Sequence, residues 1–177
     1  MITKDIKETI KRFFFVNPNS KLRVREIEKK LKLSLPSVIR YCKELQKEEI
    51  LTTIKTGNVV FYTADKTNSN FILQKKFYNL NSMYESGLIE FLKKELSNPP
   101  VLVFGSYSRG EDIETSDIDL YIETSSNKII DLHDFEKELK RNIQVFKHKS
   151  VREIKNVNLA NNILNGVILN NYLEVFK

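Results

Sequence analysis

The stretch VLVFGSYSRGEDIETSDIDLYIE, residues 101–123, decides the fold. It begins with four apolar residues between two prolines and Gly105, a pattern that predicts a short, buried strand. After Ser106 and ten further residues a second predicted strand begins, in which polar and apolar residues alternate. Asp117 and Asp119 occupy alternate positions of this strand, so both project from one face, about 6–7 Å apart along the chain.

Two carboxylates this close repel one another, and burial raises their pKa values unless a cation accompanies them. Mg²⁺ removes this conflict, because it takes oxygen ligands and is commonly shared with substrate phosphates. The preceding turn supplies groups for such a phosphate. Gly105 lets the backbone approach closely, the Ser106 hydroxyl can bind phosphate oxygens, and Arg109 adds a charge suited to bidentate contact. The stretch therefore predicts a site for a metal-bound phosphate.

Gly105-Ser106, ten residues and then Asp117-Ile118-Asp119 resembles the GS-x10-D-x-D signature of the polymerase-β-like nucleotidyltransferase superfamily. The short sequence that follows resembles the minimal nucleotidyltransferases of that superfamily. The resemblance implies that Asp117 and Asp119 are catalytic and hold Mg²⁺, while Gly105, Ser106 and Arg109 bind the nucleotide. A bare D-x-D also occurs on solvated edge strands, so the interpretation depends on the complete pattern.

The reaction implied by the resemblance is transfer of a nucleoside monophosphate from an NTP, with ATP as the expected donor, to a hydroxyl. Minimal nucleotidyltransferases often act as antitoxins that AMPylate a HEPN-domain toxin. Such a toxin, on a separate chain, is therefore an expected partner.

A third carboxylate, which active members usually carry on the strand after the next helix, is missing. Here that strand is predicted over residues 142–147, NIQVFK, and Gln144 occupies the expected position. A glutamine carbonyl can bind a metal but cannot accept a proton at neutral pH. Glu111, Asp112 and Glu114 could compensate from the loop. Two alternatives stay open: a catalytically inactive DNA-binding regulator that senses nucleotide or dimerises, and an interaction scaffold.

Composition indicates two modules with different partners. Residues 1–66 carry 15 Lys and Arg against 8 Asp and Glu, whereas residues 67–177 carry 14 against 15. The basic excess therefore belongs to the first part of the chain. The single cysteine, Cys42, excludes an intrachain disulfide. No apolar run approaches the roughly 20 residues that span a bilayer, and the N-terminus does not resemble a signal peptide, so we expect no membrane contact and a cytoplasmic location.

The basic part has the element order of a winged helix-turn-helix domain: helices over 3–16, 24–31 and 35–48, then strands over 50–54 and 59–63. In such folds the third helix enters the major groove of DNA. Winged helices also serve as protein-interaction modules, which is the alternative interpretation. The candidate DNA contacts are Ser34, Ser37, Arg40, Tyr41, Lys43, Lys55 and Asn58.

The remaining patterns complete an α+β prediction. Residues 69–97 are predicted as helix broken near Asn79–Asn81, and the aromatic residues of the first segment, before the break, offer an alternative seam for a homodimer. After the D-x-D strand we expect a helix near 133–139, a strand, a helix over 158–169 and a last strand over 172–176. The predicted domains are a winged helix over 1–66, a helical connector over 67–97 and a small α/β nucleotidyltransferase-fold domain with a mixed sheet over 98–177.

Overall fold

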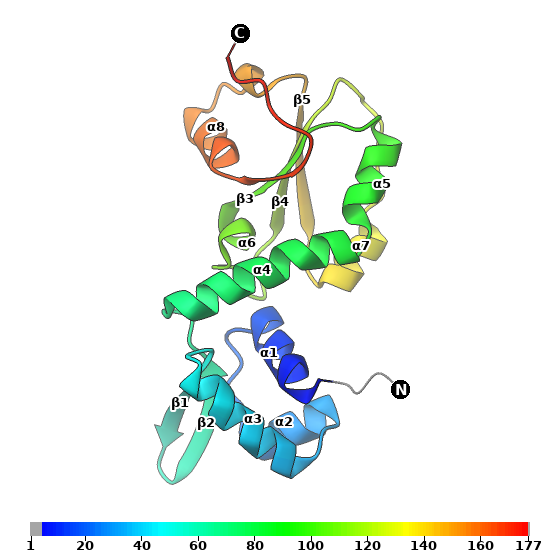
Figure 1. Cartoon of the computed structure of the whole chain (residues 1–177). Helices are drawn as coiled ribbons and strands as arrows, with labels where there is room; N and C mark the ends of the chain where they lie inside the picture. The colour runs from blue at the N-terminus through cyan, green and yellow to red at the C-terminus, as the bar shows by residue number, and fades with distance from the viewer. Residues whose placement is uncertain (1–4, 177) are drawn as a thin grey trace. The chain divides into compact units, whose positions relative to one another are not determined.

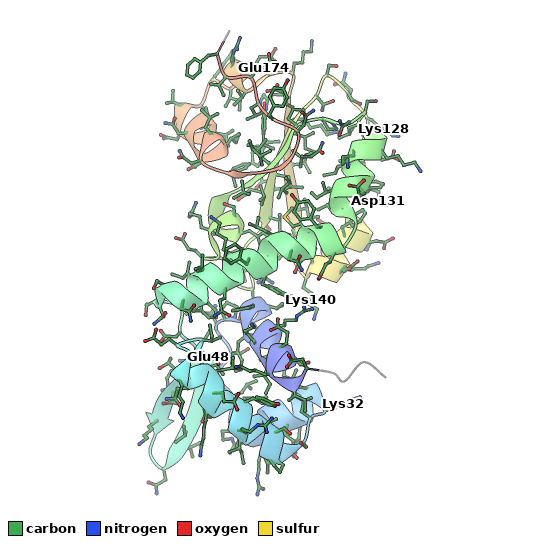
Figure 2. All side chains as sticks on the ribbon, in the orientation of Figure 1. Lys32, Glu48, Lys128, Asp131, Lys140 and Glu174 are labelled. Atoms are coloured by element: carbon green, nitrogen blue, oxygen red, sulfur yellow. The ribbon has the colours of Figure 1, made fainter. Side chains whose placement is uncertain are left out.

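The computed structural model describes residues 5–176 and divides into two compact units, Met1–Tyr78 and Asn79–Lys177 (Figure 1). Helix α4 (Ser69–Glu85) runs through this division, so the predicted connector contributes to both units. Charged side chains such as those of Lys32 and Lys128 are exposed on the surface (Figure 2). Within residues 5–176, no helix has both the length and the apolar character needed to cross a bilayer.

The first unit has the winged-helix arrangement, which confirms the predicted fold class. A short bridge between Leu22 and Tyr62 adds a third segment to its antiparallel hairpin. Asp5 caps the first helix by accepting a hydrogen bond from the Glu8 amide (3.0 Å). The predicted start of that helix at residue 3 lies outside the described residues. The elements are α1 (Ile6–Val16), α2 (Val24–Leu31), α3 (Leu35–Lys47), β1 (Leu51–Thr56) and β2 (Val59–Ala64).

The three helices and the hairpin of this unit enclose one apolar core, which includes Ile10, Phe14, Ile27, Val38 and Leu45. Cys42 belongs to this core and is fully buried. Burial raises the pKa of its thiol to about 12. Cys42 is therefore a small core residue and not a nucleophile.

The second unit contains a four-stranded sheet in the order β5-β4-β3-β6. β4 and β5 are parallel, and the other pairs are antiparallel, which confirms the predicted mixed sheet. Its elements after α4 are α5 (Leu88–Glu95), β3 (Val101–Phe104), α6 (Gly105–Arg109), β4 (Ile118–Glu123), α7 (His133–Leu139), β5 (Ile143–His148), the 3-10 turn η1 (Val151–Glu153), α8 (Val157–Leu164) and β6 (Val167–Asn170).

Both faces of this sheet are covered, which explains why β3 is apolar at every position. α5 and α7 pack on the face that carries Ile118, Leu120 and Ile122. On the opposite face, Tyr121 packs with Ile163 of α8. Figure 1 shows α5 and α7 on one side of the sheet and α8 on the other. Asp119 lies on the same face of the sheet as Tyr121, which α8 covers, because successive residues of a strand point to opposite faces.

The predicted helix break near Asn79–Asn81 is wrong. α4 continues through these residues to Glu85, and the chain turns only at Gly87, which has φ of 77°. Asn79 is held inside the helix because its side chain is buried and bonds to neighbouring groups of the second unit. Tertiary contacts therefore outweigh the weak helix propensity of asparagine.

The predicted boundaries at the C-terminal end are also wrong. The helix expected over 158–169 ends at Leu164, and β6 follows where helix was expected. Gly166 lies so close to β3 that a Cβ there would be 2.7 Å from the Val103 carbonyl oxygen. The strand expected over 172–176 is absent from the described residues, and Arg152 instead donates to the carbonyls of Glu174 and Val175.

Candidate functional site

The D-x-D pair and the glycine turn meet at one end of β4. Asp117 directly precedes the strand and Asp119 is its second residue. Gly105 has a left-handed φ of 72°, and a Cβ on it would lie 2.3 Å from Asp119 Oδ2. Only glycine fits this position, because both the backbone conformation and the neighbouring carboxylate exclude a side chain. The two parts of the predicted site therefore contact one another.

The sequence predicts a turn after Gly105, but the structure places the start of a short helix there. α6 begins at Gly105, and no side chain of the described residues caps it by a hydrogen bond. The Ser108 hydroxyl donates to the Gly105 carbonyl (2.9 Å) within the helix. The first amide groups of a helix have no intrahelical acceptor, so they favour an anion beside Ser106.

Burial, and next the negative charge of Asp117, raise the pKa of the Asp119 carboxyl above its ordinary value. The arrangement thus disfavours two ionised carboxylates by themselves. A cation bound between these side chains would offset both effects. The two carboxylates would therefore ionise together most readily with a cation between them.

The parallel strand β5 places an amide beside each aspartate. Gln144 is paired in register with Asp119, and the Asn142 amide donates to Asp117 Oδ1 (3.3 Å). Gln144 thus lies directly beside Asp119, and its side chain is exposed. Asn142 was not among the predicted residues, although Asn142 and Gln144 at the start of β5 repeat the spacing of Asp117 and Asp119 at the start of β4.

The available donors fit a hard divalent cation such as Mg²⁺, which accepts carboxylate and amide oxygens and keeps several waters. Asp117, Asp119 and Gln144 would supply these oxygens. Within residues 5–176, no cluster of three or more His, Cys, Asp or Glu side chains is arranged to hold a metal ion. A metal held by Asp117 and Asp119 would take its remaining ligands from amide, water and phosphate oxygens.

Arg109 lies at the end of α6, where its exposed side chain pairs with Glu111 (2.7 Å). Exposed ion pairs contribute little to stability, so this guanidinium can exchange its partner for a phosphate at small cost. In this structure Glu111 faces Arg109 through the same contact.

A buried ion pair between Arg141 and Asp112 links the segments that surround the site. Arg141 Nη2 lies 3.1 Å from Asp112 Oδ2, and the two side chains are 4% and 1% exposed. The Asn79 amide donates both to Asp112 Oδ1 (2.7 Å) and to the Tyr107 carbonyl (2.9 Å). This network joins α6, the loop before β4 and the turn before β5. Both carboxylate oxygens of Asp112 are paired within this network, so Asp112 is unavailable as a third metal ligand.

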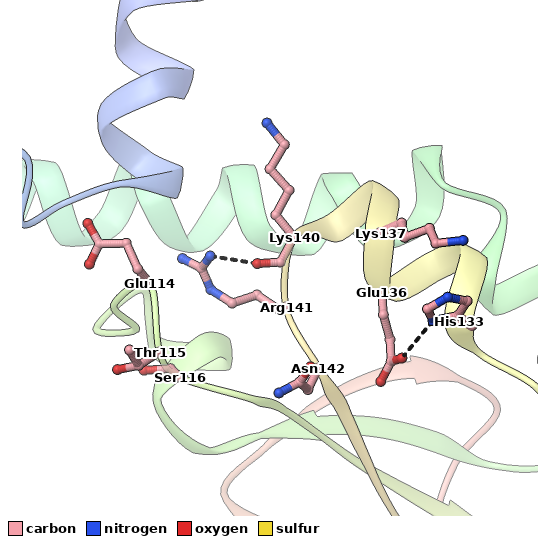
Figure 3. Close-up of a pocket in the computed structure, with 9 residues that line it drawn as sticks. All are labelled: Glu114, Thr115, Ser116, His133, Glu136, Lys137, Lys140, Arg141 and Asn142. Atoms are coloured by element: carbon pink, nitrogen blue, oxygen red, sulfur yellow. Dashed lines mark hydrogen bonds and ion pairs between the residues drawn. The ribbon is translucent and has the colours of Figure 1, made fainter.

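A polar pocket of about 290 Å³ lies at this edge of the sheet. Figure 3 shows Arg141 and Asn142 between the loop that carries Glu114 and the helix that carries Glu136. Ser116 and Asn142, which line the pocket, flank or contact Asp117. The recess can therefore admit a polar group close to the D-x-D pair.

The candidate DNA contacts lie on α3 and on the hairpin of the first unit. Ser34 and Ser37 bond one another through their hydroxyls (2.8 Å). The Arg40 guanidinium lies 4.2 Å from the centroid of the Tyr41 ring and also bonds the Tyr41 hydroxyl. The remaining candidates are exposed: Lys43 on α3, and Lys55 and Asn58 on the hairpin.

Among the comparisons with known proteins, a family model matches most of the second unit. The family model described as "Polymerase beta, Nucleotidyltransferase" matches residues 87–175, which is half of the chain. Among solved structures, the chain is similar to a point mutant of ZitR from Lactococcus lactis, with 18% identity and a TM-score of 0.38. That similarity covers 54% of this chain and 66% of the other, just under two thirds of its length. No curated protein matches the chain.

Proposed function

Because the chain belongs to the polymerase-β nucleotidyltransferase family, we propose that its second unit binds a nucleoside triphosphate with Mg²⁺ and transfers the nucleoside monophosphate to a hydroxyl. The observation that carries this proposal is the contact between Gly105 and Asp119, which brings a phosphate-binding turn against a pair of carboxylates. ATP is the proposed donor, and the proposed location is the cytoplasm.

In this mechanism the chain mainly positions the reactants. The α6 amides, the Ser106 hydroxyl and Arg109 bind the triphosphate, while Asp117 and Asp119 hold the metal. When bound, Mg²⁺ supplies positive charge that offsets the charge of the phosphate oxygens. The acceptor oxygen forms a bond to the α-phosphorus, and the bond to pyrophosphate breaks in line with it. The hydroxyl proton passes to water, because Gln144 cannot accept it.

The acceptor is the least defined part of this proposal. From the resemblance to minimal nucleotidyltransferases, we propose a hydroxyl on a partner protein, with a HEPN-domain toxin on a separate chain as the first candidate. The polar pocket beside Asp117 is large enough to admit a side chain from such a partner. A homodimer that uses the connector remains a separate proposal.

A second candidate function is a catalytically inactive regulator that binds nucleotide and DNA. It is favoured by one observation, the pairing of Gln144 with Asp119 at the position where an acid would assist the reaction. Nucleotide binding should persist in this case, whereas transfer should be absent. Both candidates thus share the same metal and phosphate contacts.

ATP is expected to bind at least about tenfold more tightly with Mg²⁺ than in EDTA, which corresponds to roughly 1.4 kcal/mol. Without a cation the carboxylates of Asp117 and Asp119 repel the phosphates. Titration calorimetry of the full chain with ATP, in Mg²⁺ and in EDTA, measures this difference. Equal affinities in the two buffers would rule out a metal role for the aspartates.

The first unit is proposed to bind duplex DNA. Residues 1–78 carry 17 Lys and Arg against 8 Asp and Glu. We expect the logarithm of the binding constant to fall linearly with that of the salt concentration, by about 0.9 per phosphate contacted. Anisotropy titrations of the full chain between about 50 and 200 mM salt test this. An absence of binding to any duplex at low salt would leave the winged helix as a protein-interaction module.

A further inference from the structure

A groove lies between α2 and the hairpin, and none of the predicted DNA contacts on α3 lines it. Its volume is about 560 Å³. The Leu22–Tyr62 bridge, with N–H···O distances of 3.0 and 2.8 Å, holds the start of α2 beside β2. This bridge joins the two elements that form the sides of the groove. Its lining includes Arg23, Arg25 and Lys29 from α2 and its N-cap, and Asn58, Val59 and Val60 from the hairpin.

The cations of this groove are available to a ligand. Arg25 and Lys29 are exposed and lie one helical turn apart on α2. Neither forms an ion pair or a side-chain hydrogen bond with another of the residues 5–176. Arg23 pairs with Glu26 (2.8 Å), the only acid among the described residues that line the groove. Positive charge thus exceeds negative charge here, as an anionic partner requires.

On α3, most of the side chains expected to contact bases lie against neighbouring side chains, and such exposed contacts can be exchanged for DNA at small cost. Ser34 and Ser37 bond each other. Arg40 stacks on Tyr41 and lies 3.7 Å from Glu44. Arginine, lysine and amide side chains make the contacts that distinguish bases, so Arg40 and Lys43 on α3 suit base recognition, whereas the cations of the groove suit phosphate contact.

We infer that the α2–hairpin groove binds the phosphates of duplex DNA. This inference rests on the proposed DNA binding and identifies the surface and the type of contact. Phosphate contacts fix a protein on the duplex but carry no sequence information. The methyl groups of Val59 and Val60 are exposed beside the cations and can pack against sugars.

The test compares two unrelated duplexes of about 20 base pairs, labelled with a fluorophore, against the full-length chain at about 50 to 200 mM salt. The wild type should bind both, and a loss caused by a change in the groove should be the same for the two duplexes, because phosphate contacts carry no sequence information. Arg25→Ala and Lys29→Ala should each lower the salt slope by about 0.9 and weaken binding roughly five- to tenfold at about 0.1 M salt for both duplexes. The charge-preserving changes Arg25→Lys and Lys29→Arg should keep the slope, which separates a charge effect from misfolding.

Lys47→Ala is the matched control, because Lys47 is an exposed cation of the same unit that does not line the groove. An equal loss in this variant would overturn the inference, since net charge alone would then explain binding. A loss from Arg25→Ala or Lys29→Ala that is confined to one duplex would also overturn it, because the groove would then contact bases and not phosphates. Poly-L-glutamate that competes as well as DNA would instead identify an acidic protein as the ligand.

Failure of the inference and failure of the proposed function give different results. If the wild type binds neither duplex, DNA binding itself is wrong. If the wild type binds but Arg25→Ala and Lys29→Ala leave the slope and the affinity unchanged, DNA binding stands and only the groove is wrong.

Discussion

Asp119→Asn should lower nucleotide transfer by roughly 10²–10³-fold or more, because it removes a charge that would hold the metal at the reacting phosphate. The change keeps the shape of the side chain beside Gly105. Metal-dependent ATP binding should weaken in parallel. Labelled ATP, incubated with a candidate HEPN-domain partner, measures transfer, and calorimetry measures binding.

The stability of the same variant separates a chemical effect from unfolding. Burial, followed by the charge of Asp117, raises the pKa of Asp119, so its ionisation opposes folding. That cost is present at pH values above the folded-state pKa and disappears as pH falls below the unfolded one. Asparagine does not ionise, so the Tm of Asp119→Asn at about pH 7 should equal or exceed that of the wild type. The difference should shrink on acidification.

Asp134→Asn is the matched control, because this aspartate of α7 is exposed, with 96% of its side chain accessible. Its transfer rate and ATP affinity should equal those of the wild type. Incorporation of label that survives Asp119→Asn would contradict the catalytic assignment. A lowered Tm in that variant would instead point to a structural role for the carboxylate.

The local patterns predict the centre of the site because each depends on residues close in the sequence. Strict alternation places Asp117 and Asp119 on one face of β4, and the apolar run predicts β3. The prediction that Gln144 lies near the two aspartates needs only the strand that follows the intervening helix. The structure adds the register that pairs Gln144 with Asp119.

The supporting contacts could not be predicted, because they join residues far apart in the chain. Arg141 and Asp112 are separated by 29 positions, and Asn79 and Asp112 by 33. No periodicity indicates such pairs. Asn79 shows the consequence most clearly, since asparagine suggests a helix break, whereas its buried hydrogen bonds keep it helical.

The C-terminal boundaries failed for a related reason. Leu159, Ile163 and Val167 have helical spacing, but Val167 lies in β6. The close approach of Gly166 to the Val103 carbonyl, not the pattern, decides where the helix ends. A short apolar segment fits either a helix or a strand until its tertiary neighbour is known.

Gln144→Asp or Gln144→Glu should raise the rate of nucleotide transfer, by up to about 10²–10⁴-fold, the range that general-base assistance supplies. The wild type is expected to transfer slowly while it still binds ATP; no transfer at all would favour the inactive regulator. The reason is the register of β5, which places the Gln144 amide beside Asp119, where a carboxylate could take the acceptor proton. The side chain is exposed, so a charge there should not disturb the fold.

The measurement is the initial rate of label transfer from ATP to the same partner, with ATP affinity determined in parallel. Asn127→Asp is the matched control, since it adds one negative charge to an exposed loop residue beyond the opposite end of β4. It should leave the rate unchanged. Gln144→Asp combined with Asp119→Asn should be inactive, because the added base needs the metal site in order to act. Fast transfer by the wild type, unaffected by either change at Gln144, would show that the proton leaves by another route and that β5 does not supply the third position.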